Sequence, residues 1–252
     1  MDLDIYFDEL LTICKKKNFL IRHIGEVFLD PIYLITPELF DHRLPTLLIA
    51  AGFHGEECGG PLGLLEFLKS DINNLLSKVN LSFLPVVNPS GLRLDRRTNI
   101  YHERTNNGFI HCDISLLSQE GKILTKWLEL LLTYSKNGFL SLHEDVLSSN
   151  AYVYTFEDLE IPGPFSTSFV DILKQYYPIL PNGISLRGDE ERGICHNGII
   201  FNFHDSTFED LLFHKGIKQT ACTETPGSGD LDLRIKVNSE LIKSFINYYI
   251  QN

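Results

Sequence analysis

The sequence predicts a single α/β domain over residues 1–252, built on a mixed, mostly parallel sheet. Short apolar runs typical of buried strands alternate along the chain with segments of helical apolar spacing. A chain of 252 residues fits one large domain and can bury a full core without disulfides. No linker, repeat or low-complexity stretch divides it.

In the first third of the chain, apolar residues at helical spacing followed by Lys15-Lys16-Lys17 predict a helix over residues 3–16. Residues 19–23 and 27–35 are expected to form two strands with a turn at Gly25. The next expected elements are a buried strand at 46–51, a helix at 61–77 and an apolar strand at 81–87.

A long polar loop is expected at residues 88–118, and its length suggests a function. Near the C-terminus, Leu241, Phe245 and Tyr249 are spaced for one buried face of a helix over residues 231–250. The elements expected between these are helices at 120–134 and 165–177 and strands at 138–142, 152–155 and 219–223.

The composition argues against several classes of partner. A net charge of −11 and a pI near 5.2 disfavour nucleic acid, whose phosphates favour basic surfaces. No uninterrupted apolar run approaches membrane-spanning length, so no membrane partner is expected. The acidic start lacks the features of a signal peptide, and five cysteines without a close pair suggest mostly reduced thiols. These features predict a soluble, cytoplasmic protein.

Candidate metal ligands follow the predicted buried strands. His54 and Glu57 lie three residues apart in a glycine-rich loop after the strand at 46–51, so both can bind one ion from the same side. His143 ends the strand at 138–142. Loops at the carboxyl ends of strands build the sites of open α/β sheets. Two nitrogens and one carboxylate leave a position open for water on zinc, so the pattern suggests a zinc enzyme.

Each candidate also has a simpler explanation. The same spacing at His23 and Glu26 lies in a predicted hairpin, where an exposed histidine and a turn glutamate suffice. An isolated histidine at the position of His143 is more often a hydrogen-bonded core residue. Glu224 ends a third buried strand, where an unpaired charge is costly and so needs a partner or a task. Candidate residues at the ends of three separate strands are a much rarer coincidence than a candidate at the end of one.

Further motifs complete a resemblance to a known family. Asn88-Pro89-Ser90-Gly91 precedes Arg97-Thr98-Asn99, and Leu142-His143 precedes Thr223-Glu224-Thr225. Together with His54-x-x-Glu57, their order and spacing resemble the zinc metallocarboxypeptidase (funnelin) family over residues 45–230. The segment from Asn88 to Asn99 looks most like that of small bacterial members acting on peptidoglycan-type peptides. The resemblance implies an α/β/α sandwich around a twisted sheet of about eight strands.

The resemblance also implies roles for five residues. His54, Glu57 and His143 would hold one zinc ion per chain, Glu224 would be the general base, and Arg97 would stabilise the oxyanion. Zinc lowers the pKa of its bound water to roughly 7 and polarises the carbonyl. The expected reaction is hydrolysis of the C-terminal amide bond of a small peptide. Alternatively, Arg97 is one of several solvated arginines in its loop.

Substrate recognition departs from the pattern of the family, which holds the terminal carboxylate with an Asn-Arg pair before an aromatic residue. Here Asn106 matches, but Asn107 replaces the arginine. Its neutral amide cannot supply the pair of charged hydrogen-bond donors with which a guanidinium binds a carboxylate. Either another arginine of this loop (Arg93, Arg96 or Arg104) reaches the site, or no free carboxylate is required. Glu144, after His143, either favours a basic or diaminopimelate-type substrate or is a solvated or histidine-orienting carboxylate.

The family resemblance places residues 187–210 in loops over the cleft. Candidate pocket residues near or within this segment are His196, His204, Asp205 and His214, although surface or structural histidines are commoner.

Two other functions fit the same residues. A zinc-dependent deacylase of N-acyl amino acids uses similar ligands on similar folds. A non-catalytic protein could instead use the zinc cleft to bind peptides, but Glu224 and Arg97 argue against it because a pure binder needs neither.

Overall fold

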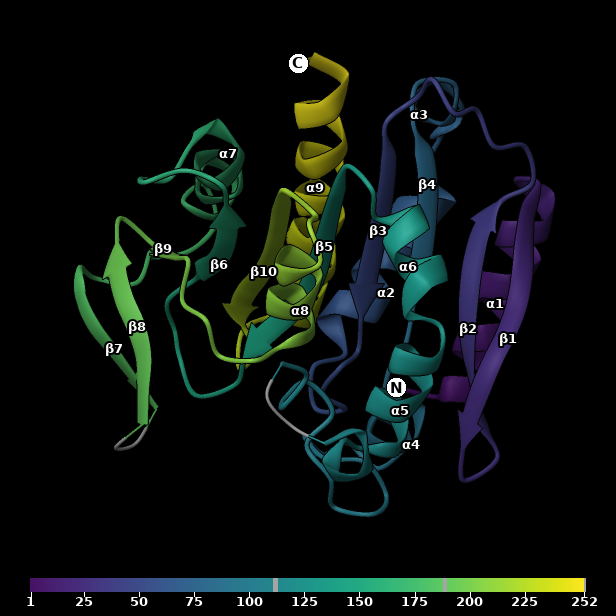
Figure 1. The fold of residues 1–252 in the computed structure, drawn as a ribbon, viewed down its shortest axis with the longest axis horizontal. Coiled ribbons are helices and arrows are strands. Elements are labelled where there is room, and N and C mark those ends of the chain that lie inside the picture. The colour runs from purple at the N-terminus through teal and green to yellow at the C-terminus, as the bar shows by residue number, and fades with distance from the viewer. Residues whose placement is uncertain (111–112, 188–189, 252) are drawn as a thin grey trace.

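A computed structural model describes residues 1–110, 113–187 and 190–251. In this part of the chain, ten strands form one sheet in the order β1-β2-β4-β3-β5-β10-β6-β9-β8-β7 (Figure 1). The strands are β1 Phe19–Val27, β2 Asp30–Pro37, β3 Thr46–Ala51, β4 Asn80–Leu84, β5 Gly138–Asp145, β6 Tyr152–Glu157, β7 Gly183–Arg187, β8 Glu190–His196, β9 Ile199–Phe201 and β10 Gln219–Pro226.

Helices cover both faces of this sheet, which confirms the predicted α/β/α architecture (Figure 1). One face packs against α1, α2, α7 and α9, around a core that includes Phe67 and Phe245. The other face packs against α5, α6 and α8, around Phe139 and Phe208. The helices are α1 Leu3–Lys16, α2 Gly59–Lys69, α3 Asn73–Leu76, α4 Pro89–Arg93, η1 Ile114–Leu116, α5 Gln119–Lys126, α6 Leu128–Tyr134, α7 Pro164–Leu173, α8 Phe208–His214 and α9 Leu231–Gln251.

The centre of the sheet consists of the parallel strands β4, β3, β5 and β10. Every residue of β3 is buried because helices cover both of its faces, and this explains its continuous apolar run. Antiparallel pairs flank the centre on both sides, and β6 with β9 adds one more parallel pair. The sheet is therefore mixed, as predicted, with its parallel order concentrated at the centre.

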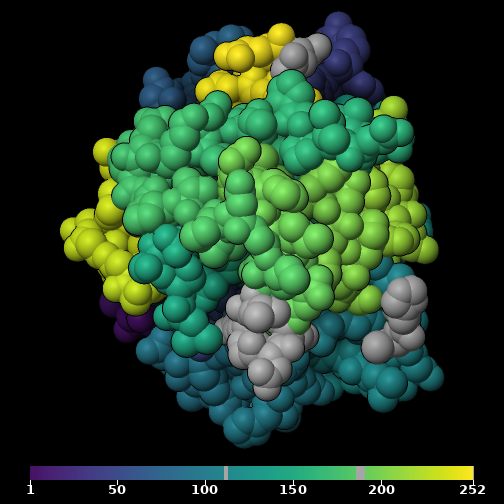
Figure 2. All heavy atoms as spheres, turned by 90° about the vertical axis from the view of Figure 1, so that its left-hand side faces the viewer, coloured from purple at the N-terminus to yellow at the C-terminus, as the bar shows by residue number. Residues whose placement is uncertain are grey.

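The sheet has ten strands rather than about eight because β7, β8 and β9 extend one end of it. The sequence analysis expected loops over most of this segment. Ile184 of β7 and Ile194 of β8 are exposed, so these strands lack the apolar run that marks a buried strand. Figure 2 views the molecule from this end, where green and yellow-green surface from the second half of the chain predominates.

Other boundaries differ from the expected ones as well. The helix expected at 61–77 is divided into α2 and α3, and the strand expected at 81–87 ends at Leu84. β1 continues through Gly25 with a bulge, and the turn lies at Phe28 and Leu29, which both have positive φ. The helix expected at 120–134 is divided into α5 and α6 at Trp127, whose indole nitrogen donates to the carbonyl of Ile24, 2.7 Å away.

The C-terminal helix α9 has 21 residues and buries Leu241 and Phe245 as predicted. No helix within the described ranges is both long and apolar enough to cross a bilayer.

The parallel centre determines where the candidate site lies. The carboxyl ends of β3, β5 and β10 reach the same edge of the sheet, with Ala51 opposite Leu142 and Glu224 opposite His143. Residues at and just after these ends are therefore brought together from three distant parts of the sequence.

Candidate metal centre and catalytic site

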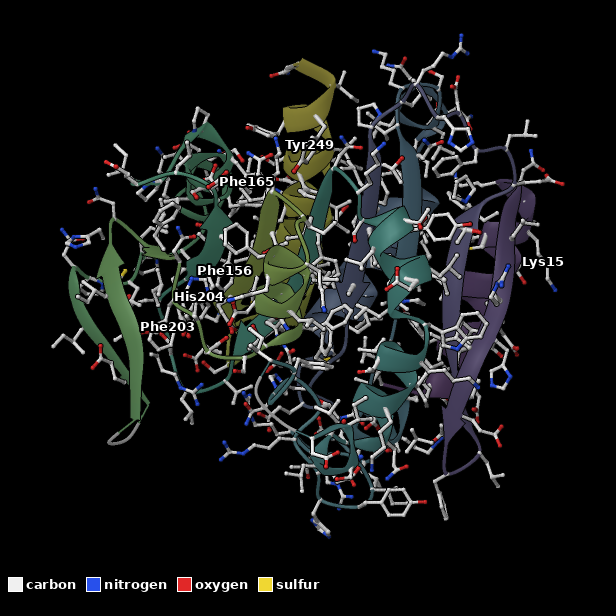
Figure 3. All side chains as sticks on the ribbon, in the orientation of Figure 1. Lys15, Phe156, Phe165, Phe203, His204 and Tyr249 are labelled. Atoms are coloured by element: carbon white, nitrogen blue, oxygen red, sulfur yellow. The ribbon has the colours of Figure 1, made fainter. Side chains whose placement is uncertain are left out.

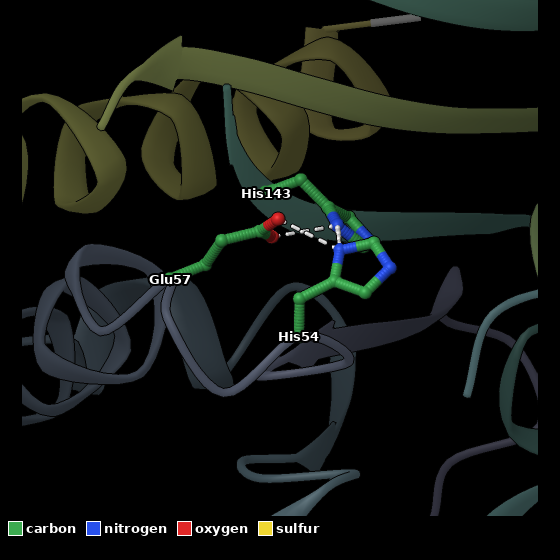
Figure 4. A group of neighbouring side chains, drawn as sticks. All are labelled: His54, Glu57 and His143. Carbon is green, nitrogen blue, oxygen red and sulfur yellow. Dashed lines mark hydrogen bonds and ion pairs between the residues drawn. The ribbon is translucent and has the colours of Figure 1, made fainter. Parts of the chain in front are cut away.

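His54, Glu57 and His143 converge at this edge (Figure 4). The Nδ1 atom of His54 lies 2.7 Å from Oε1 of Glu57, and Nδ1 of His143 lies 2.9 Å from Oε2 of the same carboxylate. The two Nδ1 atoms are 3.2 Å apart. All three side chains are almost completely buried. Two imidazole nitrogens and one carboxylate thus point at one small volume, which is the donor set predicted from the sequence.

Glycines allow the loop after β3 to reach this position. Gly52 has a φ of +65°, which favours glycine over residues with a side chain. Gly55 packs so closely on the loop of residues 88–97 that a Cβ there would lie 1.9 Å from the carbonyl carbon of Gly91. The backbone nitrogen of Gly55 also donates to the carbonyl of Arg96. The two loops therefore hold His54 and Glu57 in place together.

The electrostatics of the cluster suit a cation. Burial lowers the pKa of His54 to about 4, so this imidazole is neutral at pH 7. Burial opposes the charged form of His143, but the carboxylates of Glu57 and Glu209 outweigh it and raise its pKa to about 10. Burial also opposes ionisation of Glu57, yet the two histidines hold its pKa well below its usual range. The neutral His54 can offer a lone pair, and the ionised carboxylate of Glu57 favours a positive charge beside it.

Glu224 lies beside His143 on the neighbouring strand β10. Its Oε2 atom is buried, and none of the described residues offers it a hydrogen bond. Burial, reinforced by the charge of Glu57, raises the pKa of Glu224 to about 8. A carboxyl group with an open acceptor and a pKa near neutrality can accept a proton and then return it.

Arg97 approaches the cluster from the loop after α4. Its Nη1 atom lies 3.2 Å from Oε1 of Glu57 and 3.5 Å from Oε1 of Glu56. Asn88 holds this loop, since its side-chain nitrogen donates to the carbonyls of Phe53 and Arg97. The Asn88-Pro89-Ser90-Gly91 motif thus positions a guanidinium beside the candidate metal ligands.

A cavity of about 410 Å³ opens over these groups. His54, Arg97, His143 and Glu224 all line it. A neighbouring cavity of about 610 Å³ shares six of its lining residues with the first, including Asn106, and is also lined by the exposed Asn107. The shared wall consists of His54, Arg97, Asn106, Arg192, Asp205 and Thr207.

Two predicted substrate-binding residues lie outside these cavities. Arg93 forms ion pairs with Asp4 and Asp30, at 2.7 and 2.8 Å. Glu144 points into the protein, where it pairs with Arg234 at 2.9 Å and accepts a hydrogen bond from the backbone of Gly59. Burial explains the partners of Glu144, because a carboxylate inside the protein needs a cation and donors.

Glu209, on α8, is a site residue that the sequence analysis missed. It is buried, lines the first cavity and lies 3.8 Å from Nε2 of His143. It accepts hydrogen bonds from Ser141 and from Asn106, whose own oxygen accepts from the backbone of Phe208. Burial opposes its ionisation, but these donors and His143 hold its pKa below its usual range. The seven-residue α8 carries no motif that marks this carboxylate.

Comparisons with known proteins agree with this geometry. No family model matches the sequence, and no curated protein matches it. Among solved structures, a candidate metallopeptidase from Shewanella baltica OS155 is 38% identical, covering 98% of this chain and 92% of its own, with a TM-score of 0.93. Another from Shewanella amazonensis SB2B is also 38% identical, covering 98% of this chain and 93% of its own, with a TM-score of 0.92.

A more distant structure shares the fold. A metallo-carboxypeptidase from Burkholderia cenocepacia is 14% identical, and the match covers 96% of this chain and 67% of that one, with a TM-score of 0.71. This more distant match shows a shared fold.

Proposed function

This chain belongs to a family of metallopeptidases with the zinc carboxypeptidase fold, and from that premise we propose that it is a zinc-dependent carboxypeptidase. It hydrolyses the C-terminal amide bond of a small peptide. The observation that carries this proposal is the convergence of His54, Glu57 and His143 with Glu224 at one cavity.

The three ligands fit one zinc ion per chain. Bond lengths of about 2.0–2.1 Å in tetrahedral geometry separate neighbouring ligand atoms by roughly 3.3 Å. The closest distances among Nδ1 of His54, Nδ1 of His143 and the Glu57 oxygens are 2.7, 2.9 and 3.2 Å, so movements of a few tenths of an ångström suffice. Bound there, zinc supplies a Lewis acid that polarises the carbonyl and acidifies water.

Three residues around the metal ligands supply the other functions that the reaction needs. Glu224 takes a proton from the attacking water and gives it to the leaving amine. Arg97 offers a guanidinium to the oxygen that becomes negative as the carbonyl carbon turns tetrahedral. Glu209 orients His143 from behind, as carboxylates commonly do for metal-binding histidines.

We propose a substrate whose terminal residue carries a positive charge. Asp145 and Asp205 line the first cavity together with Arg192, beside the catalytic groups. We assign recognition of the terminal residue to Asn106 and Asn107, with a preference for basic or diaminopimelate-type residues. The alternative is a zinc-dependent deacylase of N-acyl amino acids. Such enzymes also often bind a carboxylate, so Asn107 does not distinguish the two functions, whereas a panel of peptides and N-acyl amino acids does.

We also propose a reducing, cytoplasmic location. Cys14, Cys58, Cys195 and Cys222 are free thiols, which is common in such compartments.

The variant Glu224→Gln tests the proposal. With dipeptides and tripeptides ending in lysine, arginine or diaminopimelate, we expect kcat to fall by about 10²–10⁴-fold while zinc content is unchanged. The exposed Glu66→Gln serves as the control and should keep its activity. Undiminished turnover in Glu224→Gln would remove this residue from its role. Turnover of N-acyl amino acids alone would replace the peptidase with the deacylase.

A further inference from the structure

A second group of potential metal ligands consists of His204, just before α8, and Asp210 and His214 on that helix. Nδ1 of His204 is 2.6 Å from Oδ1 of Asp210, and Nδ1 of His214 is 3.0 Å from the same oxygen. The ligand atoms of the three residues all lie within 4.8 Å of one another. This group shares no residue with the cluster of His54, Glu57 and His143.

The local fold brings these side chains together. Asp210 and His214 are one turn apart on α8, a spacing that places both on one face of the helix. His204 precedes the helix, and its ring packs beside Phe156 at 5.6 Å between centroids (Figure 3). The rings of His204 and His214 are 4.9 Å apart.

Burial differs among the three in a way that suits a surface site. The side chain of Asp210 is completely buried, whereas those of His204 and His214 are 47% and 45% exposed. The other oxygen of Asp210 accepts a hydrogen bond from the backbone of Ser206, which fixes the carboxylate. Ions can therefore reach the two imidazoles from solvent and meet a rigid anionic ligand below them.

We propose that His204, Asp210 and His214 bind one divalent transition-metal ion of the zinc type. Two imidazole nitrogens and one carboxylate oxygen select zinc, nickel or copper over magnesium and calcium, which prefer oxygen ligands. Neighbouring ligand atoms around a tetrahedral zinc ion are roughly 3.3 Å apart, so the observed 2.6 and 3.0 Å require only a small opening. Water fills the remaining position.

The bound ion would also tie the cavity wall to α8. Asp205 and Thr207, which line the cavities, lie between His204 and the helix, and Glu209 is adjacent to Asp210. A cross-link from His204 to α8 thus restrains the segment that forms one side of the substrate cavity. Metal binding at this site does not depend on the proposed peptidase activity.

Zinc titration of the metal-free full chain tests the proposal. By equilibrium dialysis with Zn²⁺ alone, we expect the wild type to bind about two ions per chain. His204→Ala and His214→Gln should each lose one ion, and His143→Ala should lose the other. The exposed His23→Ala is the matched control and should bind as the wild type does. Circular dichroism verifies that each variant is folded.

The variants separate this site from the catalytic one. Loss of one ion in His204→Ala and in His214→Gln, with His143→Ala retaining one, supports the surface site whatever the enzyme activity is. Binding of a single ion that only His143→Ala removes would overturn it, and so would equal binding of Mg²⁺. In either case His204 and His214 only donate hydrogen bonds to Asp210.

Discussion

At the scale of single residues, Glu209 lies behind His143, one of the three proposed metal ligands. Its carboxylate accepts hydrogen bonds from Ser141 and Asn106, and one oxygen lies 3.8 Å from Nε2 of His143, a buried atom with no hydrogen-bond partner among the described residues. A small closing movement would let this nitrogen donate to the carboxylate, and a histidine held in that way is fixed in orientation and becomes a stronger ligand. Glu209 therefore connects the candidate substrate residue Asn106 to the metal centre.

We predict that Glu209→Gln weakens zinc binding at the catalytic site by about 10–100-fold, because the amide keeps the shape but loses the charge that faces His143. Competition with a chromophoric chelator measures the affinity. The exposed Glu160→Gln should leave it unchanged. An affinity equal to that of the wild type would show that Glu209 does not act on His143.

A second residue-scale prediction concerns Asn107, which is exposed beside the shared cavity wall. Asn107→Arg should lower KM for substrates with a free terminal carboxylate and leave kcat nearly unchanged, because a guanidinium binds that carboxylate in two places. Amidated versions of the same peptides should show no gain. Equal effects on acid and amide substrates would place Asn107 away from the terminal carboxylate.

At the scale of elements, the loop that carries Arg97 depends on a buried polar network. The side-chain nitrogen of Asn99 donates to Glu103 at 2.7 Å and to Glu120 of α5 at 2.8 Å. Glu120 is completely buried, and burial raises its pKa above the usual range. This network anchors the loop to α5 and so helps to hold Arg97 at the site.

The raised pKa of Glu120 predicts how stability changes with pH. A carboxyl group whose pKa is higher in the folded than in the unfolded protein stabilises the fold at low pH. This stabilisation is complete below the unfolded pKa, roughly 4.3, and is lost as the pH rises through the pKa of the folded state. Glu120→Gln stays neutral, so its free energy of unfolding should decline less than that of the wild type between pH 4 and pH 8. Urea unfolding at both pH values measures the difference.

Glu103→Gln is the matched control, since it alters a carboxyl group on the same asparagine. Hydrogen bonds from Asn99 and the backbone of Gln119 overcome burial and hold the pKa of Glu103 below its usual range. Its replacement should therefore lower stability at pH 8 rather than protect it. Parallel pH profiles for wild type and Glu120→Gln would contradict the buried-acid interpretation.

Buried elements were predictable from sequence because their apolar runs reflect burial on both faces. β3 and β5 are such strands. The buried face of α1 around Leu10 and that of α9 around Phe245 follow from the helical spacing of their apolar residues. β7 and β8 were missed because an edge hairpin leaves Ile184 and Ile194 exposed and needs no apolar run. Edge strands are defined by hydrogen bonds to a neighbour, which a local pattern does not encode.

At the scale of the whole molecule, the parallel centre of the sheet builds the site. β3, β5 and β10 end at one edge, so His54, His143 and Glu224 meet although long stretches of sequence separate them. Their strand-end positions could be predicted from local patterns. The contacts of Glu209, Arg93 and Glu144 could not, because each depends on which distant element packs against it.

Metal content tests the central claim most directly. Protein purified without chelators and dialysed against metal-free buffer should retain about one tightly held zinc ion per chain by mass spectrometry. Glu57→Gln and His143→Ala should lose this ion, whereas the exposed His23→Ala should keep it. A wild type that holds no zinc even after zinc is added back, or variants that hold as much as the wild type, would contradict the assignment of His54, Glu57 and His143 as the catalytic metal site.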